Sequence, residues 1–105
     1  MNGSEAPSLS SLVAGVTDGL TGAERAEAKG EVTWTRSGRL FAALAADVLE
    51  VRLQGLVARA ALRTPDTNTS ARGEGWVSFA PATLDRYAAD RARAWIESAW
   101  RHASG

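Results

Sequence analysis

The chemistry that this chain could carry rests first on a single histidine, His102, near its C-terminus. A catalytic triad needs a histidine beside a nucleophile and an orienting carboxylate, and no serine stands in the Gly-x-Ser-x-Gly pattern of a nucleophile elbow. The sequence has no cysteine, which excludes disulfides, thiolate zinc sites and cysteine nucleophiles. His102 is therefore predicted to be an exposed or capping residue at a helix end, where the helix dipole favours its charged form.

The carboxylates and glycines do not form a recognisable catalytic or binding motif either. Asp47 and Glu50 flank the start of a predicted strand, and Asp85 is explained by the preference for acids near a helix N-terminus. The glycines at 73 and 75 lack the lysine and hydroxyl residue of a phosphate-binding loop. No spacing gathers metal ligands. The sequence thus predicts a protein that is not an enzyme and that uses no cofactor and no metal.

Arginine is the remaining candidate, because eleven of the twelve cations are arginine. If the first hairpin turn and the long loop lie together, four arginines can form an anion-facing patch: Arg36, Arg39, Arg52 and Arg72. Trp34 or Trp76 beside them would add a stacking platform for a base. The alternative is that these arginines are solvated and are neutralised by nearby acids, which are Glu31, Glu50 and Glu74.

Composition places limits on the partner and the compartment. Twelve basic and twelve acidic residues cancel, whereas a protein that grips phosphates usually has a basic excess. The 105 residues suit one domain, 8–105, after a disordered segment, 1–7. No apolar stretch approaches the roughly 20 residues of a membrane span, and residues 1–10 do not resemble a signal peptide. A cytoplasmic protein without a membrane partner is expected.

The elements that would position these residues follow from hydrophobic periodicity. Apolar residues at helical spacing predict a helix that starts near Ser8 and ends at Gly19 or Gly22, and "AERAEAK" predicts a shorter helical piece that stops at Gly30. "EVTWTR", "LFAALAA" and "DVLEVRLQG" predict three successive strands. "LVARAALR" predicts a short helix, "TPDTNTSARGEG" a loop and "WVSF" a fourth strand.

The last helix is predicted to open at Pro81 and to carry a broad apolar face. Trp100 stands at the edge of that face, where an exposed aromatic would mark an interface. The predicted order is α-(α)-β-β-β-α-β-α. We therefore expect an α+β fold, with an antiparallel four-stranded sheet and helices packed on one face.

Short motifs in this order resemble the MmcQ/YjbR-like proteins. The matching positions are Gly38, Arg39, Phe41, Ala42, Trp76, Val77, Ala99 and Trp100. The N-terminal domain of TfoX-like proteins and the bacterial luciferase-like domain have a similar order of elements, although the histidines of the luciferase-like pattern are absent here. The resemblance covers roughly residues 18–103 and implies a compact α+β fold and, for this family, DNA binding.

Three functions remain open at this point. The first is nucleic-acid binding through the four arginines. The second is a protein-interaction or self-association module, monomeric or homodimeric, with Trp100 at the interface. The third is a small-molecule pocket between sheet and helices. In the opening of the fourth strand, Trp76 is expected to pin the long loop to the sheet.

Overall fold

The computed structural model describes residues 8–104, so the segment 1–7, predicted to be disordered, lies outside the described residues. The described chain has an α+β fold. Its helices are α1 (Leu9–Asp18), α2 (Gly55–Ala61) and α3 (Arg86–His102). Its strands are β1 (Ala23–Ala28), β2 (Glu31–Arg36), β3 (Arg39–Ala45), β4 (Val48–Arg52), β5 (Thr67–Thr69) and β6 (Trp76–Phe79).

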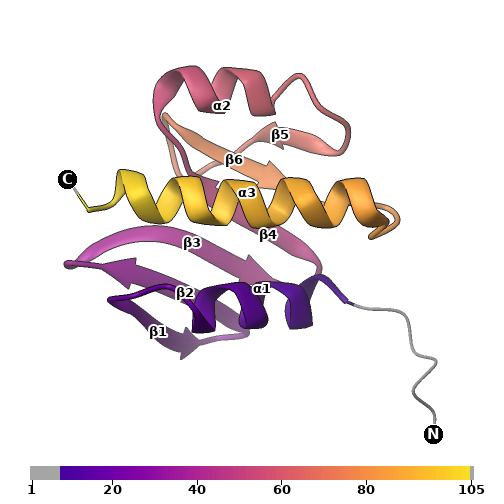
Figure 1. Ribbon diagram of the computed structural model, residues 1–105. Helices are drawn as coiled ribbons and strands as arrows, with labels where there is room; N and C mark the ends of the chain where they lie inside the picture. The colour runs from indigo at the N-terminus through magenta and orange to yellow at the C-terminus, as the bar shows by residue number, and fades with distance from the viewer. Residues whose placement is uncertain (1–7, 105) are drawn as a thin grey trace, which may run out of the picture.

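All six strands form one antiparallel sheet in the order β1-β2-β3-β4-β6-β5 (Figure 1). The first four strands are a meander, and β6 returns beside β4 after α2. The α+β class and the antiparallel sheet confirm the sequence-based prediction. The number of strands does not, because the sheet has six strands where four were expected.

Two segments account for that difference. The segment "AERAEAK" was expected to be helical but forms the outer strand β1, paired along its length with β2. Its alanines and glutamates favour helix, but the following Lys29 and Gly30, at φ 56° and 79°, form the two-residue turn that a hairpin requires. The second segment is β5, three residues inside the predicted loop that pair with β6.

The last helix begins later than predicted. Pro81 does not open it, because α3 starts at Arg86 with Asp85 as its N-cap. The Asp85 Oδ1 atom accepts a hydrogen bond from the Ala88 backbone N–H at 2.8 Å, which satisfies one of the free donors at a helix start. Within residues 8–104, no helix is both long and apolar enough to cross a membrane.

The core lies between one face of the sheet and the two helices α1 and α3, which lie in front of the sheet in Figure 1. Register places rows of apolar side chains on this face, among them Trp34, Ala42, Val51 and Val77. Helix α3 packs on β3 and β4, and the Trp95 and Phe79 rings meet edge to face with centroids 5.1 Å apart. Helix α2 lies against β6.

A β-bulge refines this packing. Trp34 pairs with Ala42, but Thr35 pairs with Leu40, so Phe41 is an extra residue in β3. Phe41 is fully buried in the core. The bulge thereby adds an aromatic side chain to the core that strict alternation would not have predicted.

Candidate functional site

The first pair of candidate arginines lies at one hairpin end, on the helix side of the sheet. Arg36 and Arg39 are cross-strand neighbours that enclose the turn at Ser37 and Gly38. The Arg36 guanidinium turns toward α3, where it donates to the Trp100 carbonyl at 2.9 Å and stacks 4.0 Å from the Trp100 ring centroid. Arg36 is thus engaged within the fold, whereas Arg39 is exposed.

The second pair lies on the opposite face, which we call the open face because α1 and α3 do not cover it. Arg52 is exposed there and pairs with Trp76 across β4 and β6. Arg72 reaches the same face from the β5–β6 loop and contacts Glu50. The sheet therefore separates Arg36 from Arg52 and Arg72, and the four arginines share no common surface.

Arg72 is the centre of a polar cluster on the open face, the Arg72 cluster, made with Glu31, Glu50 and Ser70. Its Nε donates to Glu50 Oε1 at 2.8 Å, and its terminal nitrogen donates to Glu31. The Ser70 hydroxyl and Glu50 share a further hydrogen bond. Glu31 stands on β2 and Glu50 on β4, so the guanidinium spans β3 between them.

The charge of Arg72 is balanced by these contacts. Burial acts to lower the pKa of Arg72, but the hydrogen bond that Arg72 donates to Glu50 and the charges of Glu31 and Glu50 outweigh it and raise the pKa. A raised pKa means that this cation contributes its full stabilisation at neutral pH and loses it only in strong alkali. Because two carboxylates already engage it, Arg72 offers little charge to a phosphate.

Trp76 lies under this loop. Its side chain is almost buried but belongs to the open face, outside the main core cluster. The Arg72 guanidinium stands 5.4 Å from the Trp76 ring centroid, within the range of a cation–π contact. This geometry agrees with the expectation that Trp76 pins the long loop to the sheet.

Trp100, the candidate interface residue, is also engaged. It is half-buried, packs against the core and donates from its indole Nε1 to the Thr21 carbonyl at 2.8 Å. With Arg36 on its ring, Trp100 ties the end of α3 to the turn before β1 and to β2. Its interface role stays a prediction, and one face of its ring is occupied by Arg36 within the chain.

His102 is the last residue of α3 and is exposed, as expected for a helix-end histidine. Within residues 8–104, no three side chains of His, Asp or Glu come close enough to hold a metal ion.

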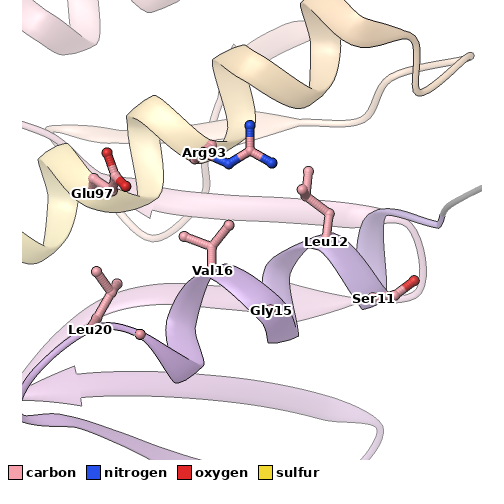
Figure 2. A pocket seen from close by; sticks show the side chains of 8 residues that line it. Ser11, Leu12, Gly15, Val16, Leu20, Arg93 and Glu97 are labelled. Atoms are coloured by element: carbon pink, nitrogen blue, oxygen red, sulfur yellow. The ribbon is translucent and has the colours of Figure 1, made fainter.

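A groove lies between α1 and α3 (Figure 2), and sequence reasoning did not identify it. Its volume is about 390 Å³. One wall presents the half-buried row Leu12, Val16 and Leu20, and the exposed positions beside them are Ser11, Gly15 and Gly19. Arg93 and Glu97 of α3 form the other wall. The groove therefore has an apolar wall on α1 and, on α3, one cation, Arg93, and one anion, Glu97.

A smaller hollow of about 250 Å³ lies between α2 and the end of the long loop. It is lined by Gly55, Ala58, Arg59, Leu62, Thr69, Gly73, Glu74, Gly75 and Trp76. Leu56, beside it on α2, is 68% exposed. Trp76 therefore contacts the Arg72 guanidinium and also lines this hollow.

The outer strand β1 is the second feature that sequence reasoning missed, because its residues were interpreted as a helix. Every residue of β1 after Ala23 is exposed, and β2 is its only strand neighbour within the described chain. Arg25 and Glu27 form an exposed ion pair at 3.8 Å on this strand. The signal that could have found β1 is the Lys29–Gly30 dipeptide immediately before a clear strand.

Comparison with protein-family models, with curated proteins and with solved structures finds no match to this chain. The resemblance to MmcQ/YjbR-like proteins therefore stays a prediction from short motifs.

Proposed function

We propose that this chain is a non-enzymatic protein-interaction module whose docking edge is β1. A strand at the edge of a sheet presents a row of free N–H and C=O groups, and proteins use such edges to bind another strand. The observation that supports the proposal is the exposure of β1, which has six residues and no proline. At the other edge of the sheet, β5 has three residues, so β1 is the longer template.

The charged and small side chains of β1 suit a specific and reversible contact. Glu24, Arg25 and Glu27 make the strand polar, which disfavours the indiscriminate pairing of apolar edges. The alanines at 23, 26 and 28 leave room for a neighbouring strand. Binding at β1 would therefore draw on main-chain hydrogen bonds for affinity and on Arg25 and Glu27, which share one face of the strand, for selectivity.

The test uses the ¹⁵N-labelled full chain and two probes added in excess. One probe is the unlabelled chain, and the other is a short synthetic peptide of alternating threonine and valine. We expect at least one probe to shift the amide resonances of residues 23–29 and to slow their exchange with solvent. If neither probe affects these amides at millimolar concentration, β1 is not a docking edge and the proposal fails.

The groove between α1 and α3 supports a second candidate function, the binding of a small molecule. Its volume lies within the range of about 300–1,000 Å³ typical of ligand sites. Its apolar row and its Arg93 would suit a compound with an apolar body and an acidic group. Nothing lies within 4 Å of a Cβ built on Gly15, so Gly15→Leu can fill the groove without a backbone clash.

A ligand-observed NMR screen of small aliphatic and aromatic carboxylic acids tests this candidate. We expect hits that bind the original chain and lose binding to Gly15→Leu, with Ala14→Leu on the exposed side of α1 as the matched control. Hits that bind both variants equally, or a screen without hits, would remove the groove from consideration.

The nucleic-acid hypothesis remains untested. Because the sheet separates its arginines, the geometry supports the protein-interaction proposal better.

A further inference from the structure

We infer that the partner of β1 is a second copy of this chain, paired antiparallel across a two-fold axis at Ala26. The inference rests on the proposed function, since it needs β1 to be a docking edge. It specifies which strand binds there and in which register. The two sheets would then continue into one another through β1 and its symmetry mate.

The backbone of β1 sets the first condition. Ala28 and Glu31 close the two-residue turn at Lys29 and Gly30, and the pair that closes such a turn is a hydrogen-bonded pair. Hydrogen-bonding direction alternates along an antiparallel strand. Counting back from Ala28, the N–H and C=O groups of Glu27 and Arg25 therefore point away from β2 toward the free side.

Symmetry sets the second condition. Two antiparallel copies of one strand are related by a two-fold axis perpendicular to the sheet, so a residue must pair with a residue of the same face. Arg25 and Glu27 share the helix side of the sheet, because their partners on β2 are Trp34 and Val32 of the core face. Odd-numbered residues of β1 must therefore meet odd-numbered residues of the second copy.

Charge then selects among the permitted registers. An axis at Arg25 would place the two Arg25 side chains opposite each other, and an axis at Glu27 would do the same with glutamates. An axis at Ala26 places Arg25 opposite Glu27 of the second copy, and Glu27 opposite its Arg25. This register makes two cross-strand pairs of opposite charge, which stabilise a sheet, whereas like charges opposite each other destabilise it.

The rest of the strand accepts this register. Ala26 meets Ala26 at the axis, and Glu24 meets Ala28, so no like charges face each other directly. Arg25 and Glu27 are 57% and 63% exposed and already adopt a loose ion pair within the chain. Arg25 and Glu27 can each give up this contact within the chain and form an ion pair with the oppositely charged residue of the second copy. The four outward N–H and C=O pairs of Arg25 and Glu27 are hydrogen-bonded at the same time.

Charge reversal tests the register by analytical ultracentrifugation from micromolar to millimolar concentration. We expect the original chain to dimerise, and Arg25→Glu and Glu27→Arg each to weaken the dimer about tenfold, because each converts two attractive pairs to repulsive ones. An equimolar mixture of the two variants, and the double variant, should recover the dimer. Glu24→Arg is the matched control: it makes the same change of charge on the opposite face of β1, where Glu24 meets the uncharged Ala28, and it should leave the dimer unchanged.

Cross-linking gives an independent readout, because the chain has no cysteine of its own. Ala26 faces its mate as a non-hydrogen-bonded pair, with Cα atoms about 4.5 Å apart, which is within disulfide range. Ala26→Cys should therefore form a covalent dimer on mild oxidation, and Glu24→Cys should do so far more slowly. Circular dichroism of every variant confirms that the fold is retained.

The outcomes separate the two proposals. A dimer that shifts the β1 amides but ignores charge reversal and does not cross-link at Ala26 overturns this register and leaves the docking edge intact. A chain that stays monomeric at millimolar concentration overturns the second-copy inference, and binding of the threonine–valine peptide to β1 then still supports the proposed function. Failure of both probes overturns both.

Discussion

The guanidinium of Arg72 stands 5.4 Å from the ring centroid of Trp76, four residues further along the chain. The same guanidinium contacts Glu50 on β4 and Glu31 on β2. One side chain thus holds the β5–β6 loop against three strands of the open face. Arg72, which the sequence offered as a phosphate-binding residue, acts in this structure as a structural tie.

The first prediction follows from that tie. Arg72→Met keeps much of the apolar stem and removes the charge, and we expect it to lower the free energy of unfolding by about 1–2 kcal/mol, because Glu50 and Glu31 lose a charge-assisted partner while remaining partly solvated. Urea denaturation measures the loss. Arg52→Met, an exposed arginine on the same face, is the control and should change stability by less than about 0.5 kcal/mol.

A double-mutant cycle with Glu50→Gln sharpens this result. If Arg72 acts through Glu50, the two substitutions together should destabilise the fold by less than the sum of their separate effects. Additive effects would mean that Arg72 stabilises the loop through Glu31 and Trp76 and not through Glu50.

The second prediction concerns the turn between β3 and β4. Ala45 pairs with Val48, and Ala46 between them has φ 53°, a left-handed conformation in which a Cβ is unfavourable. Ala46→Gly should therefore raise the free energy of unfolding by about 0.5–1 kcal/mol, less the entropy that glycine adds to the unfolded chain. Thermal denaturation would show a higher midpoint. The matched control is Ala60→Gly, at an exposed position of α2, which should lower the midpoint. A lower midpoint for Ala46→Gly would contradict the argument.

The third prediction tests the start of α3. Asp85→Ala removes the side-chain acceptor for the Ala88 N–H and should destabilise the protein by about 1 kcal/mol. Asp85→Asn retains an acceptor and should recover most of that loss. Pro81→Ala should have little effect on α3, because the helix begins after it. Equal losses at Asp85 and Pro81 would indicate that the helix extends back to the proline.

These comparisons show which parts of the fold a single sequence can predict. The strands β2 and β4 were predicted correctly because their sequences alternate, as Leu49 and Val51 show on β4, and β3 and β6 because each is a short apolar run that follows a turn or loop. The strand β1 was not predicted, because an edge strand that is exposed on both faces has neither an alternating pattern nor an apolar run. Its alanines and glutamates favour a helix, and it is the pairing with β2 that makes the segment a strand.

The candidate site shows the same limit. Sequence reasoning placed Arg36 beside the first hairpin turn and Arg72 at the end of the long loop, but it did not show which residues their guanidinium groups would contact. Those partners are distant in the sequence, Trp100 for Arg36 and Glu31 for Arg72. The possibility that nearby glutamates neutralise the arginines was open from the sequence, and the Arg72 cluster realises it for one of the four.

The last prediction concerns nucleic acid. Phosphate binding needs several cations on one surface. Of the four candidate arginines, Arg36 is engaged with Trp100 and Arg72 with two glutamates, which leaves Arg39 and Arg52 exposed. We therefore expect no electrophoretic retardation of single- or double-stranded DNA by this chain at low salt. Retardation that falls steeply with salt and disappears in the Arg39→Ala/Arg52→Ala variant would contradict this expectation and restore the nucleic-acid hypothesis on those two residues. Retardation that the variant leaves unchanged would place the binding surface elsewhere, and Arg59 and Arg63 near α2 would be the next substitutions, because both are exposed.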